Sequence, residues 1–173
     1  MTYFSELCRA MESVAAHPRS IFLGQAVACE GTGMSRSFAG LPREKLLELP
    51  VFEECQLGMS IGLALDGMLP VSVFPRWNFL VCAANQLVNH LDKLPLYSGF
   101  RPRVIVRVAV PTAEPLDPGR QHRGNFSHAF RLMFKTIRVV ELDEAEEIVP
   151  AYERALKRDG STILVEFSEK YGR

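Results

Sequence analysis

The chain has 173 residues, of which 47% are hydrophobic, and its 20 basic side chains are balanced by 20 acidic ones. This length fits one domain with a full hydrophobic core. The zero net charge argues against a surface that gathers nucleic acid or an anionic membrane.

The four cysteines are scattered along the chain and form no CxxC pair and no cysteine–histidine cluster. We therefore expect reduced, mostly buried thiols rather than a disulfide framework or a metal site. The N-terminal segment lacks a basic-then-apolar signal pattern, and no apolar run reaches the roughly 18 residues of a membrane span. The sequence thus predicts a cytoplasmic protein without a membrane partner.

The first half of the chain predicts helices and strands around one long loop. Apolar residues at helical spacing over 3–16 predict an amphipathic helix. The apolar run at residues 21–23 predicts a short buried strand. Residues 28–44 are rich in Gly, Ser and Thr and predict a long loop, and loops of this length are often functional. A helix at 55–66 and a strand at 69–74 follow.

The second half begins with a helix predicted at 77–93. Residues 103–110 (RVIVRVAV) predict a strand buried on both faces, as in parallel sheets. A second long loop, rich in Pro and Gly, occupies 111–126. The remaining elements are a strand at 137–140, a helix at 143–158 and a strand at 162–167.

Strands separated by helices predict an α/β fold. Right-handed crossovers then build a doubly wound, mostly parallel sheet with helices on both faces. In such sheets, ligands bind beyond the carboxyl ends of the strands. Because both long loops follow strands, we expect them to lie at that edge.

Residues 50–79 read PVFEECQLGMSIGLALDGMLPVSVFPRWNF. The acidic pair Glu53 and Glu54 precedes a helix rich in small residues, and on spacing alone it also suits the positive end of a helix dipole. Glycine within a helix costs about 1 kcal/mol relative to alanine, so small residues indicate close packing against the sheet or a second chain. The small residues are Gly58, Ser60, Gly62 and Ala64.

This arrangement resembles the transketolase-like pyrimidine-binding domain of thiamine-diphosphate enzymes, specifically the N-terminal half of the 2-oxoacid dehydrogenase beta subunit. The resemblance covers most of the chain, and its most specific parts are the Glu53–Phe79 block and the segment NQLVNHLDKLPLYSG. It implies that Glu53 bonds to N1′ of the aminopyrimidine ring and relays a proton. It implies that Phe79, in RWNFL, packs on that ring. Glu54 is the alternative acid if the register is shifted by one residue.

The resemblance extends to two further positions, at each of which this sequence departs from the pattern of the family. The family has a QHS-type segment whose histidine helps to bind or protonate the substrate. Gln121 and His122 match it, but Arg123 replaces the serine, and a solvated loop histidine remains the alternative. Where the family has an acid near the cofactor, IFLGQAV has Gln25, which can hydrogen bond but cannot exchange a proton. This implies altered chemistry or reduced activity.

Typical beta subunits continue into a second, C-terminal domain, which we expect to be absent, so that 1–173 form a single pyrimidine-binding domain. The diphosphate-binding motif, GDG with a downstream asparagine, is also missing from the sequence. We therefore expect no metal ligand on this chain. The resemblance implies thiamine diphosphate as cofactor, with Mg²⁺ held mainly by an alpha-type partner chain, and a homodimer contact that gives a heterotetramer.

Two functional hypotheses follow. The first is that the chain is one subunit of a thiamine-dependent enzyme of the 2-oxoacid dehydrogenase, decarboxylase or transketolase-like type. This enzyme would act on a small 2-oxoacid by decarboxylation or by acyl or aldehyde transfer. The second is a non-catalytic scaffold or regulatory module that retains the fold. A weaker third is an unrelated flavodoxin-like binder in which Thr32 and Ser35 cradle a phosphate, although a lysine-bearing P-loop is missing.

Overall fold

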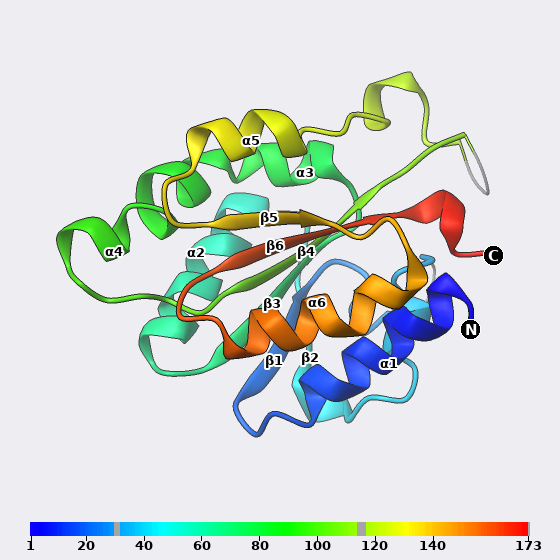
Figure 1. Cartoon of the computed structure of the whole chain (residues 1–173), viewed down its shortest axis with the longest axis horizontal. Helices are drawn as coiled ribbons and strands as arrows, with labels where there is room; N and C mark the ends of the chain where they lie inside the picture. The colour runs from blue at the N-terminus through cyan, green and yellow to red at the C-terminus, as the bar shows by residue number, and fades with distance from the viewer. Residues whose placement is uncertain (30–31, 114–116, 173) are drawn as a thin grey trace.

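The computed structural model describes residues 1–29, 32–113 and 117–172. Its core is a six-stranded sheet of order β2-β1-β3-β4-β6-β5 in which every pairing is parallel (Figure 1). The strands are β1 (Ser20–Gly24), β2 (Leu46–Glu48), β3 (Leu69–Phe74), β4 (Ile105–Val110), β5 (Arg138–Glu141) and β6 (Thr162–Phe167).

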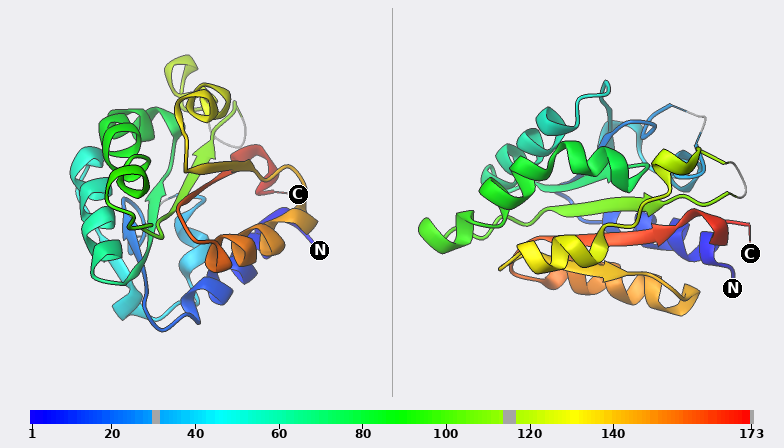
Figure 2. Two further views of the ribbon diagram at one scale, coloured as in Figure 1. Left: turned by 60° about the vertical axis from the view of Figure 1, so that its left-hand side comes forward. Right: turned by 90° about the horizontal axis from the view of Figure 1, so that it is seen from above.

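Helices cover both faces of this sheet (Figure 2). The α-helices are α1 (Tyr3–Ala15), α2 (Glu53–Leu65), α3 (Trp77–Cys82), α4 (Leu94–Tyr97), α5 (Ser127–Met133) and α6 (Ala145–Lys157). A π-helical segment, η3 (Gln86–Leu91), follows α3. Helices α1 and α6 pack together over one face, while α2, α3, η3 and α5 contribute to the core on the other. The predicted doubly wound α/β architecture is confirmed.

The predicted strands at 69–74 and 162–167 are confirmed residue for residue. Strand β2 was not predicted, because its three half-buried residues carry no alternating pattern. The helix predicted at 77–93 is broken into α3 and η3. Parts of the two predicted loops, 30–31 and 114–116, lie outside the described residues, as does residue 173.

The prediction of mostly buried cysteines is wrong. Cys29, Cys55 and Cys82 are exposed, Cys8 is half-buried, and all four thiols are free. Cys55 and Cys82 lie on the outer faces of α2 and α3, because Leu57 and Leu80 fill the inner faces. Within the described residues, no helix is long and apolar enough to cross a membrane.

A buried ion pair crosses the middle of the sheet. Arg107 of β4 donates from Nε and Nη2 to the two carboxylate oxygens of Glu166 in β6, at 2.8 and 2.9 Å, and both side chains are fully buried. Ser37 accepts from Arg107 Nη1 at 2.7 Å, and the Tyr171 hydroxyl donates to Glu166. Burial alone would lower the pKa of Arg107, but the Glu166 carboxylate raises it above its ordinary value. The guanidinium is therefore charged and tied by three hydrogen bonds to its neighbours.

We predict that Glu166→Gln lowers the free energy of unfolding by about 3–5 kcal/mol, because it leaves a buried guanidinium without its counter-charge. Urea denaturation followed by far-UV circular dichroism measures this change. The exposed Glu169 provides the control, since Glu169→Gln should change stability by less than about 0.5 kcal/mol. Equal effects of the two substitutions would show that the ion pair does not support the sheet.

Candidate functional site

Glu53 is the first residue of α2, and its side chain is turned inward. Only 8% of its surface is exposed. Gln25, in the turn that follows β1, donates from Nε2 to Glu53 Oε1 at 3.3 Å. The structure therefore brings together two of the residues predicted to meet the cofactor. The amide of Gln25 contacts the acid directly, at the position where the family has a second acid.

Glu54 has different partners. Its Oε1 accepts hydrogen bonds from Asn85 Nδ2 at 2.7 Å and from Gln86 Nε2 at 2.9 Å, which join the start of α2 to the start of η3. These two bonds lower the pKa of Glu54. The carboxylate of Glu54 is thus engaged by η3, whereas that of Glu53 faces Gln25. This difference distinguishes two adjacent acids that the sequence alone leaves as alternatives.

Gln56 fixes the first turn of α2 against the sheet. Its Nε2 donates to Ser72 Oγ at 3.0 Å and to the carbonyl oxygen of Val73 at 2.9 Å, and its side chain is almost fully buried. At Gly24, φ is +145° and a Cβ would collide with the Val73 carbonyl oxygen, so the turn after β1 requires glycine. The start of α2 is therefore held tightly between β1 and β3.

Glu48, the last residue of β2, holds the chain segment next to Gln25. Its Oε1 accepts from the backbone N–H of Ala26 at 2.7 Å, and its Oε2 accepts from Val27, Ala28 and Cys29 at 2.9, 2.7 and 3.3 Å. Ala26 has φ +54°, which turns successive N–H groups toward one anion. We did not identify Glu48 from the sequence, because its role depends on β2 lying beside β1 with Glu48 opposite Gly24.

Phe79 and His122 form a second pair at the same edge of the sheet. Their rings meet edge to face with centroids 5.7 Å apart. The Asn78 side chain donates to the carbonyl oxygen of Gln121 at 2.8 Å, which ties the loop that carries His122 to α3. The guanidinium of Arg76 lies 5.3 Å from the centre of the Phe79 ring. The predicted histidine is therefore beside the predicted aromatic residue, and its Nδ1 is buried without a hydrogen-bond partner in the described part of the chain.

The small residues of α2 divide between two environments. Ser60 and Ala64 are buried and allow the helix to approach the sheet. Gly62 is exposed, and an added Cβ there would meet no atom within 4 Å. The outer face of the helix is also apolar, since Met59 and Leu65 are 38% and 53% exposed. Gly58 is half-buried, and a Cβ there would meet the side chain of Gln86 at 3.8 Å. Close packing on the sheet thus accounts for Ser60 and Ala64, and Gly62 faces outward.

The hydroxyls that the third hypothesis assigns to phosphate are already engaged. Ser35 Oγ accepts from the Thr32 N–H at 3.1 Å, and Thr32 Oγ1 accepts from the Ser35 N–H at 3.1 Å. Near them, a cavity of about 240 Å³ lies at the carboxyl edge between the ends of β3, β4 and β6. Arg76, which stacks on Phe79, lines this cavity.

Comparisons with known proteins give relatives of one kind. No protein-family model matches the chain. It is 25% identical over 177 residues to the pyruvate dehydrogenase E1 component subunit beta, mitochondrial, of Caenorhabditis elegans, covering 99% of this chain and 50% of that protein. It is 28% identical over 127 residues to the 3-methyl-2-oxobutanoate dehydrogenase subunit beta of Mycobacterium tuberculosis, covering 70% of this chain and 36% of that protein. The resemblance to 2-oxoacid dehydrogenase beta subunits is confirmed.

Solved structures share the fold. The chain superposes on an inactive beta4 tetramer of a split gene transketolase with a TM-score of 0.71 and 15% identity, covering 94% of this chain and 48% of that one. A putative thiamin diphosphate-dependent enzyme from Mycobacterium smegmatis gives a TM-score of 0.67 and 12% identity, covering 99% of this chain and 31% of that one. The chain thus spans half or less of the length of these relatives and neighbours.

We predict that Glu48→Ala speeds hydrogen exchange at the amides of residues 26–29, because they lose charge-assisted bonds. Bonds of this kind stabilise by about 1.5–3 kcal/mol, so exchange should become roughly 10- to 100-fold faster. Hydrogen–deuterium exchange read by NMR measures the change. The exposed Glu44 supplies a control, and Glu44→Ala should leave these amides protected. Unaltered exchange in Glu48→Ala would show that this carboxylate does not hold the segment.

Proposed function

We propose that this chain is the pyrimidine-domain subunit of a two-chain thiamine-diphosphate-dependent enzyme that acts on a 2-oxoacid. The reaction is decarboxylation or transfer of the resulting acyl or aldehyde unit. The observation that carries the proposal is the buried Glu53 at the start of α2, in contact with Gln25. The similarity of the chain to beta subunits of two 2-oxoacid dehydrogenases supports the substrate class. We place the enzyme in the cytoplasm, where its free cysteines stay reduced.

The residues present fit the pyrimidine half of the cofactor. Recognition of this ring needs one carboxylate and one aromatic surface. Glu53 makes its one hydrogen bond within the described residues through Oε1, so Oε2 is available to a ring nitrogen. Phe79 is half-buried and offers an aromatic face. Within the described residues, no group of His, Cys, Asp and Glu side chains is placed to hold a metal ion, so we assign Mg²⁺ and the diphosphate to the partner chain.

Each residue of this half-site has a distinct task. Glu53 holds and returns a proton at N1′ of the ring. Gln25 donates a hydrogen bond that orients Glu53, but it cannot carry a proton itself. Phe79 packs on the ring, and His122 assists the substrate from the neighbouring loop. The bound cofactor supplies the nucleophilic carbon and the electron sink for decarboxylation.

The partner must reach the start of α2, because Glu53 and the diphosphate act on one cofactor molecule. The outer face of α2 suits a protein contact along its length, since Phe52 before the helix, Met59 within it and Leu65 at its end are 62%, 38% and 53% exposed. Val81 of the adjacent α3 is 40% exposed. Contiguous exposed apolar side chains mark interaction surfaces. We therefore assign the outer face of α2 and α3 to an alpha-type subunit. A further contact between two copies of this chain would give a heterotetramer.

Gln25 supports a second candidate function. An amide at the position of the family's acid removes one proton-exchanging group beside Glu53. A chain that had lost catalysis but kept its fold would scaffold or regulate a catalytic relative. Thiamine-dependent turnover of the assembled complex distinguishes this candidate from the enzyme.

We predict that Glu53→Gln lowers turnover of 2-oxoacids by the complex of this chain and its partner by about 10²–10⁴-fold, because the proton relay is lost. Steady-state assays with thiamine diphosphate and Mg²⁺ measure this, and gel filtration checks that assembly persists. Glu54→Gln is the matched control and should keep most of the turnover, since Glu54 is engaged by Asn85 and Gln86. Full activity of Glu53→Gln would rule out this role, and a wild-type complex without thiamine-dependent turnover would favour the scaffold.

We predict that partner binding protects Cys55 and Cys82 from thiol alkylation, because both exposed thiols lie on the outer face of α2 and α3 and covered thiols are inert. Mass spectrometry after pulse alkylation of the free chain and of the complex gives the rate at each cysteine. Cys8, on α1 over the opposite face of the sheet, is the internal control and should react at the same rate in both. Fast alkylation of Cys55 and Cys82 in the complex would place the partner elsewhere.

A further inference from the structure

A cavity of about 340 Å³ lies between α6 and the edge strand β5. Thr162 and Arg138, which line it, are the first residues of β6 and β5, so the cavity is at the amino ends of these strands. The candidate site described above is at the opposite, carboxyl edge. A volume of this size is at the lower end of the range of about 300–1,000 Å³ for small-molecule sites. The cavity is therefore large enough for a small ligand and separate from the thiamine half-site.

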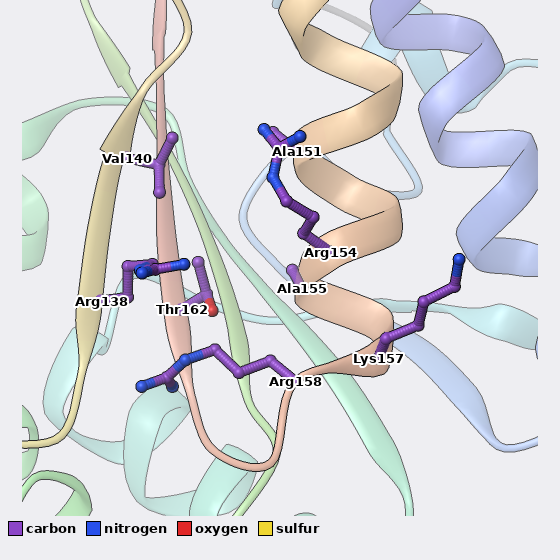
Figure 3. A pocket seen from close by; sticks show the side chains of 8 residues that line it. All are labelled: Arg138, Val140, Ala151, Arg154, Ala155, Lys157, Arg158 and Thr162. Carbon is purple, nitrogen blue, oxygen red and sulfur yellow. The ribbon is translucent and has the colours of Figure 1, made fainter.

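Three arginines converge on this cavity from three positions in the chain. Arg138 points inward from β5, Arg154 lies along α6, and Arg158 extends from the end of α6 (Figure 3). The side chains of Arg138 and Arg154 form no hydrogen bond or ion pair with other described residues, and no described acidic residue lines the cavity. Burial lowers the pKa of Arg158, and the charges of Arg138 and Arg101 lower it further. Arg158 donates to the carbonyl oxygens of Ser161 and Thr136 and lies near the charge of Asp159. The exposed Arg138 and Arg154 therefore supply the positive charge that is free to meet a ligand.

A buried hydroxyl lies among these guanidinium groups. Thr162 is only 3% exposed, and its Oγ1 has no hydrogen-bond partner among the described residues. Its side chain lies between Arg138 and Arg158 (Figure 3). Buried polar atoms without partners are uncommon, and each indicates a missing neighbour. An anion in the cavity would accept the hydrogen bond that this hydroxyl can donate.

The C-terminal dipole of α6 explains only part of the charge. A helix end carries about half a negative charge, which favours cations in the last turn. Arg154 and Lys157 are in the last turn and both line the cavity, although the side chain of Lys157 extends away from that of Arg154 (Figure 3). Arg138 belongs to β5 and contributes nothing to that turn. The dipole therefore accounts for Arg154 but not for the convergence of Arg138 and Thr162 with it.

We propose that this cavity binds a phosphate-bearing small molecule. A phosphate monoester carries about two negative charges at neutral pH and three acceptor oxygens. Two free guanidinium groups can each donate paired N–H bonds to such an anion, and Thr162 adds a hydroxyl donor. The remaining volume beside Val140 and Ala151 is apolar and accommodates the organic part.

Isothermal titration calorimetry of the full chain with inorganic phosphate, at constant ionic strength set by sodium chloride, tests the proposal. We expect saturable binding of one phosphate per chain. Arg138→Gln and Arg154→Gln should each weaken it by about tenfold or more, because a charge-assisted bond contributes roughly 1.5–3 kcal/mol. Thr162→Val, which preserves shape, should weaken it by about tenfold, because the hydroxyl also donates to a charged oxygen.

Arg43→Gln is the control, because Arg43 is an exposed arginine next to β2, at the opposite end of the strand order, and phosphate binding should be unchanged. A second titration with glycerol 3-phosphate identifies the source of the phosphate. If glycerol 3-phosphate binds more tightly than inorganic phosphate, the natural ligand is an organic phosphate ester. If the two bind equally, the ligand is the free oxyanion. The proposal is overturned if the heat of phosphate binding does not saturate, or if the cavity variants bind phosphate as the wild type does. It is also overturned if a titration with polyglutamate shows binding and the titration with phosphate shows none.

Discussion

The rest of the candidate site depends on how the first turn of α2 is held against the sheet. The amide of Gln56 bridges to β3, and the turn at Gly24 lets the backbone of β1 approach so closely that a side chain would not fit. This contact sets the depth at which Glu53 enters the fold. Glu48 then fixes the next segment through four backbone N–H groups, which brings Gln25 against the acid. Two polar side chains, the buried Gln56 and the half-buried Glu48, thus position one carboxylate, rather than the general packing of the core.

Much of the fold could be predicted from the sequence, because apolar runs such as 69–74 and 162–167 report burial directly. Glu53, Phe79 and His122 could be singled out through a family resemblance, and the structure places each at the carboxyl edge. Glu48 and Gln56 could not, since Glu48 binds N–H groups of the turn after β1, Gln56 binds groups of β3, and only the folded sheet brings these segments together. The ion pair of Arg107 could not be predicted for a related reason. Within RVIVRVAV, one buried charge is tolerated only because Glu166 lies on the neighbouring strand. The exposed cysteines were misjudged because residue type alone predicts burial on average and ignores which helix face is outward.

The arrangement is that of half a site. The described residues provide a carboxylate and an aromatic ring for a pyrimidine but no cluster that could hold a metal ion. The apolar outer face of α2, beside Glu53, is open to a second chain. At the other end of the strands, three arginines line a cavity with Thr162, whose hydroxyl has no hydrogen-bond partner among the described residues. The two ends of one sheet thus present different side chains, and we propose that one end meets a ring shared with a partner and the other an anion.

The most direct test of a shared thiamine site is a native pull-down of this chain from its source, with mass spectrometry of the co-purifying proteins. The account predicts recovery of a chain that carries a GDG motif with its downstream asparagine, in stoichiometric amount. The recovered pair should show turnover of a 2-oxoacid only when thiamine diphosphate and Mg²⁺ are present. Recovery of this chain alone, or with an unrelated partner, would contradict the account.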